Sequence, residues 1–207
     1  MDIITLTAFS VGIPFVVGLL CVKRLPWELT PFVMLCGVWF MAEGYSYILR
    51  ARGISNAHVS YFITPLEIFF FATYFFRQNP PTKFFNDTIG WLVAAGGVIV
   101  VCIDYIAFKG SMNTMSLAIE FAFVTCLCIY TFFNTSRYTA LNLTVLFYLL
   151  SSFPYFFAYE WLRVNYLSHL MLLGGVYAYT HSACYIIMAV LIWKYSSSLS
   201  ARSSYQR

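Results

Sequence analysis

The chain has 207 residues, of which 61% are hydrophobic and only 10% are charged, and its formal net charge is +4. Soluble domains carry about a quarter charged residues, so this composition excludes an ordinary soluble domain. The basic residues stand one or two at a time between apolar runs, which argues against nucleic acid as a partner. The expected solvent of this chain is the lipid bilayer.

Seven apolar runs are each long enough to cross the hydrocarbon core as a helix, which takes about 20 residues. They cover residues 3–22, 29–49, 57–76, 88–108, 112–133, 141–162 and 167–193. The runs are continuously apolar, whereas the strands of membrane barrels alternate between apolar and polar residues. We therefore predict an all-α, multi-pass protein of the cell membrane, with one seven-helix domain over residues 1–195 and a polar cytoplasmic tail over residues 196–207.

The basic residues also predict an orientation. Eight Lys and Arg residues lie in the first, third and fifth loops and the tail, whereas four lie in the second, fourth and sixth loops. Because cytoplasmic segments carry the excess of Lys and Arg, we expect the N-terminus outside and the C-terminus inside.

Acidic residues lie within the apolar runs, where charge is costly. Glu43, Glu67 and Glu120 lie about 10 to 15 Å from the ends of their spans at 1.5 Å per residue. An ionised carboxylate at mid-membrane costs about 2.5–3.5 kcal/mol, so such residues usually face the interior of the helix bundle. No Lys or Arg lies in the interior of a span. The carboxyl groups must therefore be protonated, solvated in a polar cavity, paired with histidine or compensated by a bound cation.

One histidine, His181, lies deep in a span, and tyrosines gather in the outer half of the helices. A neutral, hydrogen-bonded core histidine is one interpretation of His181, and a ligand-binding group is the other. We take Glu43, Glu67, Glu120 and His181 as the candidate ligand- or proton-binding site of an outward-facing pocket. The chain has no H-E-x-x-H, G-x-S-x-G or nucleotide-binding motif. No catalytic residue, metal site or cofactor is therefore predicted.

These features favour a protein that binds or transports a small cationic or protonatable ligand, as a transporter or a sensor. A second interpretation is an accessory or assembly subunit that binds a partner protein in a larger membrane complex and has no ligand of its own. A third is a metal-dependent membrane hydrolase, although an enzyme is not the expected class. The predicted topology is also that of heptahelical receptors, but topology alone assigns no function.

Overall fold

The computed structural model describes residues 9–79, 92, 95–100, 102, 103, 106, 114–135 and 137–204. Within these residues the chain folds into helices and forms no strand. The longer helices are α2 (Gly12–Leu20), α3 (Thr30–Ala51), α4 (Ala57–Gln78), α6 (Thr114–Asn134), α7 (Thr139–Asn165) and α8 (Leu167–Ser204). Two short 3-10 helices, η1 (Val22–Arg24) and η2 (Trp27–Leu29), join α2 to α3.

The predicted spans can be compared with these helices one by one. The second, third, fifth, sixth and seventh spans coincide with α3, α4, α6, α7 and α8. The described part of the first span contains α2, and most of the fourth span, 88–108, lies outside the described residues. Helix α8 continues to Ser204, so the predicted tail begins as helix.

The described helices have the length and composition of membrane spans. Four of them contain segments long and apolar enough to cross a bilayer, namely Trp27–Ala51, Leu117–Asn134, Thr139–Tyr159 and Ser168–Ser198. The chain is thus an all-helical protein with the character of a membrane protein. The count of seven spans and the outward N-terminus remain predictions.

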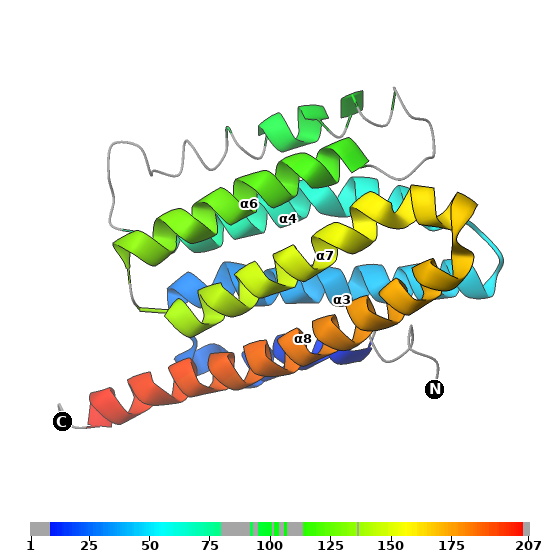
Figure 1. Cartoon of the computed structure of the whole chain (residues 1–207). Helices are drawn as coiled ribbons and strands as arrows, with labels where there is room; N and C mark the ends of the chain where they lie inside the picture. The colour runs from blue at the N-terminus through cyan, green and yellow to red at the C-terminus, as the bar shows by residue number, and fades with distance from the viewer. Residues whose placement is uncertain are drawn as a thin grey trace.

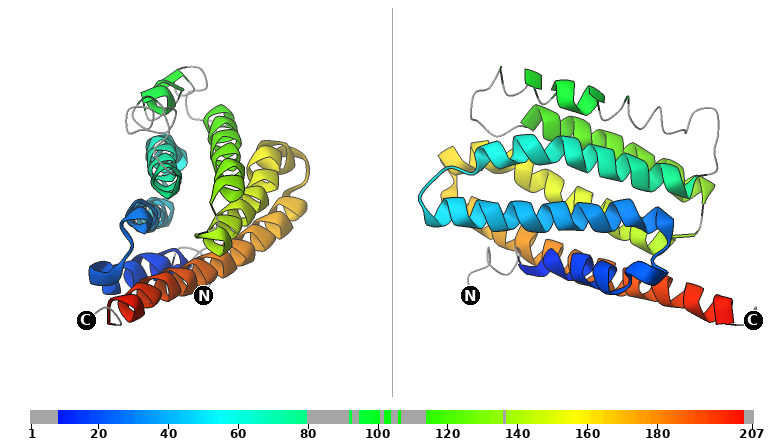
Figure 2. Two further views of the ribbon diagram at one scale, coloured as in Figure 1. Left: turned by 90° about the vertical axis from the view of Figure 1, so that its left-hand side faces the viewer. Right: turned by 180° about the vertical axis from the view of Figure 1, so that it is seen from behind.

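The six longer helices form a closed ring. Each helix packs against the next in chain order, with α4 against α6, and α8 closes the ring by packing against α2. Figure 1 shows the long helices lying side by side, and the end-on view of Figure 2 separates them into two rows. We call α2, α3 and α4 the first half and α6, α7 and α8 the second half. The halves meet where α4 packs on α6 and where α2 packs on α8.

Side chains fill the middle of the ring, and apolar side chains also cover its outside. Fully buried residues come from both halves, among them Phe32, Phe71, Tyr74, Leu141 and Met188. Large apolar side chains are exposed on every long helix, for example Leu20, Met41, Phe62, Phe133, Phe147 and Val190. Such an apolar exterior fits a helix bundle that is solvated by lipid.

Close contact between α2 and α3 depends on a glycine. A Cβ atom added at Gly18 of α2 would lie 2.3 Å from Cγ1 of Val33 on α3. A real side chain cannot approach a neighbour so closely, and small residues are what allow membrane helices to pack with their backbones near each other. Gly44 of α3 differs, because a Cβ atom there would meet nothing within 4 Å.

We therefore expect Gly18→Ala to destabilise the protein by about 1–3 kcal/mol, the usual cost of overpacking a core. The matched variant Gly44→Ala should be neutral or slightly stabilising, because alanine forms helix more readily than glycine. Thermal unfolding in detergent, followed by tryptophan fluorescence, compares the two. Equal melting temperatures for both variants would show that α2 and α3 do not pack as described.

Candidate functional site

Two carboxyl groups meet where the halves of the ring pack together. The side chains of Glu67 on α4 and Glu120 on α6 lie close enough to interact. The indole Nε1 of Trp39 on α3 donates a hydrogen bond to Oε1 of Glu67. Glu120 is only 4% exposed, and its Oε2 atom has no hydrogen-bond partner among the described residues. We call Glu67 and Glu120 the carboxyl pair.

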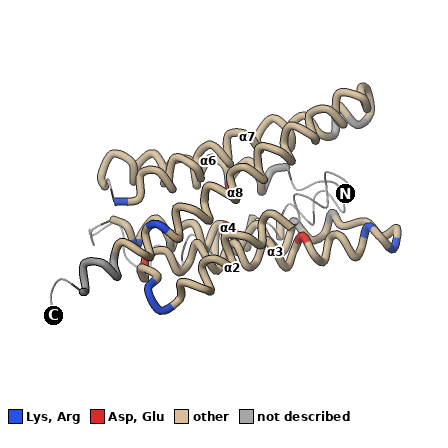
Figure 3. Tube along the Cα trace, turned by 90° about the horizontal axis from the view of Figure 1, so that it is seen from below, with Lys and Arg blue, Asp and Glu red and all other residues tan. Residues whose placement is uncertain are grey.

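Two carboxyl groups this close to each other favour a proton between them. A carboxylate only accepts hydrogen bonds, so two carboxyl groups can bond to each other only when one of them is protonated. The described Lys and Arg residues lie near the two ends of the ring rather than at the pair, as Figure 3 shows along the backbone. The nearest basic residue along α4, Arg77, lies in its last turn. We infer that the carboxyl pair lowers its charge by holding a proton, because no described basic side chain pairs with it.

Aromatic rings surround the indole that binds Glu67. Trp39 stacks on Tyr148 of α7 with ring centroids 5.2 Å apart, and it lies 6.0 Å from the ring of Tyr185 on α8. Tyr148 and Tyr177 lie 4.2 Å and 3.9 Å from the imidazole of His181. The hydroxyl of Tyr185 donates to the hydroxyl of Tyr148 over 3.2 Å. We call these five residues, Trp39, Tyr148, Tyr177, His181 and Tyr185, the aromatic cluster.

His181 is held by a neighbouring serine. Its Nε2 atom lies 2.8 Å from Oγ of Ser152 on α7, and Ser152 Oγ also lies 2.7 Å from the carbonyl oxygen of Tyr148. If the serine hydroxyl donates to that carbonyl, Nε2 of the imidazole carries the proton that it donates to the serine. His181 is 1% exposed. This arrangement fits a neutral core histidine with one fixed tautomer.

The four residues singled out in the sequence are therefore placed differently. Glu67 and Glu120 touch, and the aromatic cluster links His181 to Glu67 through Tyr148 and Trp39. Glu43 stands apart on α3, where its side chain is 43% exposed and its Oε2 atom lies 3.8 Å from Nη2 of Arg50. Among the described residues, no group of three His, Cys, Asp or Glu side chains could hold a metal ion.

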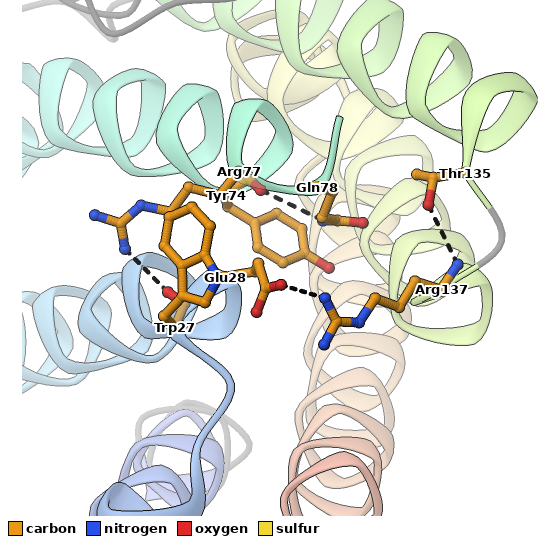
Figure 4. A network of polar contacts seen from close by, with 7 residues as sticks. All are labelled: Trp27, Glu28, Tyr74, Arg77, Gln78, Thr135 and Arg137. Atoms are coloured by element: carbon orange, nitrogen blue, oxygen red, sulfur yellow. Dashed lines mark hydrogen bonds and ion pairs between the residues drawn. The ribbon is translucent and has the colours of Figure 1, made fainter. Parts of the chain in front are cut away.

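Sequence reasoning missed a second polar region. Glu28 of η2 is 5% exposed and forms an ion pair with Arg137, in the turn between α6 and α7 (Figure 4). Burial, together with the nearby Glu28 carboxylate, raises the pKa of the Tyr138 hydroxyl to about 12. Glu28 and Arg137 are 109 residues apart. Both flank apolar runs as ordinary interfacial charges would, so no local pattern indicates that they pair.

Ser152 offers a test of how His181 is held. We expect Ser152→Ala to destabilise the protein by about 1–3 kcal/mol, because it leaves a buried imidazole nitrogen without a partner. The neighbouring Ser151 bonds the same Tyr148 carbonyl, over 2.9 Å, but not the histidine. Ser151→Ala should therefore cost less, and thermal unfolding of both variants in detergent measures the difference. An equal cost would mean that His181 does not depend on Ser152.

Comparisons with known proteins assign no family to this chain. No protein-family model matches it, and neither the curated proteins nor the solved structures give a significant match. The function is therefore inferred from the residues of the chain itself.

Proposed function

We propose that this protein binds or transports a small cationic ligand at the carboxyl pair, in exchange for the proton that the pair shares. The observation that carries the proposal is the close approach of two buried carboxyl groups, Glu67 and Glu120, inside a bundle of apolar helices. Ionisable groups at membrane depth are costly and commonly mark substrate or proton pathways. A structural role alone would be served as well by two amides, which need no proton.

The exchange of a proton for a cation follows from the charge of the carboxyl pair. With one proton the pair carries a single negative charge, and no described basic side chain lies beside it. A monovalent cation could replace the proton or neutralise the remaining charge. Either a proton or a cation then satisfies the same two carboxyl groups, so the two compete for the site.

The unpartnered oxygen and the aromatic rings together define the ligand chemistry. Oε2 of Glu120 is a buried acceptor without a donor, and such an atom favours a ligand that brings an N–H or O–H group. The aromatic cluster offers the faces of Trp39 and several tyrosines, which attract cations. The best candidate is therefore a small organic cation with N–H donors, such as an ammonium or guanidinium compound.

The arrangement of the helices favours transport over sensing. Transporters often place the substrate between two structurally separate halves near the middle of the membrane. Glu67 belongs to the first half of the ring and Glu120 to the second. A rocking motion of the halves would therefore change the distance between the two carboxyl groups, and with it their affinity for a cation.

Guanidinium tests the exchange directly, because it is permanently charged, small and rich in N–H donors. We expect guanidinium added to the purified protein in weakly buffered detergent solution to release a proton, detected with a pH-indicator dye. Tetramethylammonium, which has no N–H group, should release much less. The Glu67→Gln/Glu120→Gln double variant should abolish the release, because two amides hold no exchangeable acid proton.

Glu160→Gln is the matched control. Glu160 lies three residues from Arg163 near the end of α7, a helix that carries neither member of the carboxyl pair, and this variant should release protons like the parent protein. Proton release that persists in the Glu67→Gln/Glu120→Gln double variant would rule out the carboxyl pair as the site. Flux of guanidinium into proteoliposomes then separates a transporter from a sensor.

A further inference from the structure

Polar side chains tie the two halves of the ring together at one end. This is the end where α3 and α7 begin and where α4 and α6 finish, and we call it the Glu28 end. Glu28 of η2 pairs with Arg137 of the α6–α7 turn, and Figure 4 shows their side chains pointing toward each other across the gap between the halves. Arg137 is about half exposed, whereas the Glu28 carboxylate is buried.

Further hydrogen bonds cross between the halves beside this ion pair. The Tyr74 hydroxyl of α4 donates to Oδ1 of Asn142 on α7 over 2.7 Å, and the Asn142 amide donates to Oε1 of Gln78 over 2.9 Å. The Asn79 amide, just after α4, donates to Oγ1 of Thr131 on α6 over 2.9 Å. These bonds and the Glu28–Arg137 pair form what we call the Glu28 network.

Away from the Glu28 end, several contacts run within each half, and one buried hydrogen bond, from Ser10 Oγ before α2 to Ser182 Oγ on α8 over 3.0 Å, joins the halves. Glu43 and Arg50 both belong to α3, and the ring of Tyr45 on α3 packs against His58 on α4. In the second half, Tyr155 of α7 stacks on Tyr177 of α8 with centroids 4.5 Å apart. Among the described residues, the ion pair and the bridging amides between the halves therefore lie at the Glu28 end.

We propose that the Glu28 network is a gate, closed in this structure, that bars the Glu28 end from the carboxyl pair. Opening it requires the Glu28–Arg137 pair and the Asn142 hydrogen bonds to break, so that the halves part at this end. This proposal rests on the proposed function in one respect, namely that the gate would control access to the carboxyl pair. Its opening is a movement of the protein that can be measured without any ligand.

Buried charge explains why Arg137 controls the gate. The Glu28 carboxylate is 5% exposed, and Arg137 is its cationic partner. Removing one partner of a buried ion pair leaves a charge that is strongly destabilised where it stands. Parting of the halves would return that carboxylate to water. Loss of Arg137 should therefore shift the protein toward an open Glu28 end.

A native cysteine reports on this movement. Sγ of Cys128 on α6 lies 3.2 Å from the backbone oxygen of Asn142, and the thiol is buried behind the Glu28 network. Cys184 on α8 is equally buried and takes part in none of the hydrogen bonds that define the network. Modification of each thiol by a water-soluble maleimide, quantified by mass spectrometry on the protein in lipid nanodiscs, distinguishes local opening from unfolding. Unfolding exposes both thiols, whereas gate opening exposes Cys128 alone.

We expect Arg137→Gln to speed modification of Cys128 about tenfold, which corresponds to about 1.4 kcal/mol in favour of the open state. The rate at Cys184 should not change. Arg77→Gln is the matched control, because Arg77 lies at the same end but donates to the Trp27 carbonyl and covers its ring within the first half. That variant should react like the parent protein.

Thr131→Val gives an independent test if Arg137→Gln proves unstable. It removes one bond between the halves with little change of shape, and Asn79 keeps the Phe75 carbonyl as an acceptor. A smaller but measurable rise in the modification rate of Cys128, with the rate at Cys184 unchanged, supports the gate. Unchanged reactivity of Cys128 in a folded Arg137→Gln or Thr131→Val protein overturns it. That result would leave proton release at the carboxyl pair untouched, so the two proposals can fail separately.

Discussion

Charge inside an apolar bundle must be neutralised, and this constraint shapes the centre of the molecule. Glu67 and Glu120 come from different halves of the ring, the Trp39 indole donates to Glu67, and we propose that the two carboxyl groups share one proton. Two carboxyl groups can do this only while the halves are together. The protonation of the pair and the packing of α4 on α6 are thus linked, so a proton or a cation at the pair acts on the arrangement of the whole ring.

The two polar regions follow different rules. At the centre, the carboxyl pair has no basic partner among the described residues, and we propose that it depends on an exchangeable proton. At the Glu28 end, a carboxylate has a fixed arginine partner and amides bridge the halves, so this region holds its charge without exchange. The proposed proton-exchanging carboxyl pair lies between the two halves, and the Glu28 network joins the halves at one end. This is the arrangement that alternating access requires.

Composition and periodicity were sufficient to predict the positions of the long helices but not which side chains would meet between them. Apolar runs bounded by charges located α3, α4, α6, α7 and α8 closely, because bilayer thickness fixes the length of a span. The cost of buried charge picked out Glu67 and Glu120 but could not show that they touch, since contact depends on how α4 and α6 pack. The same argument made Glu43 a candidate site residue, although in the structure Glu43 lies beside Arg50 and apart from the carboxyl pair. Glu28 was overlooked because its partner, Arg137, is remote in sequence and near only in the fold.

The shared proton is the central claim, and infrared spectroscopy tests it most directly. A protonated carboxyl group absorbs in a band separate from that of a carboxylate, and hydrogen–deuterium exchange shifts it. The account predicts such a band in the parent protein, its loss in a Glu67→Gln/Glu120→Gln double variant, and its decrease when guanidinium is added. A band of the same intensity in the parent and the double variant, or no band in either, would contradict it.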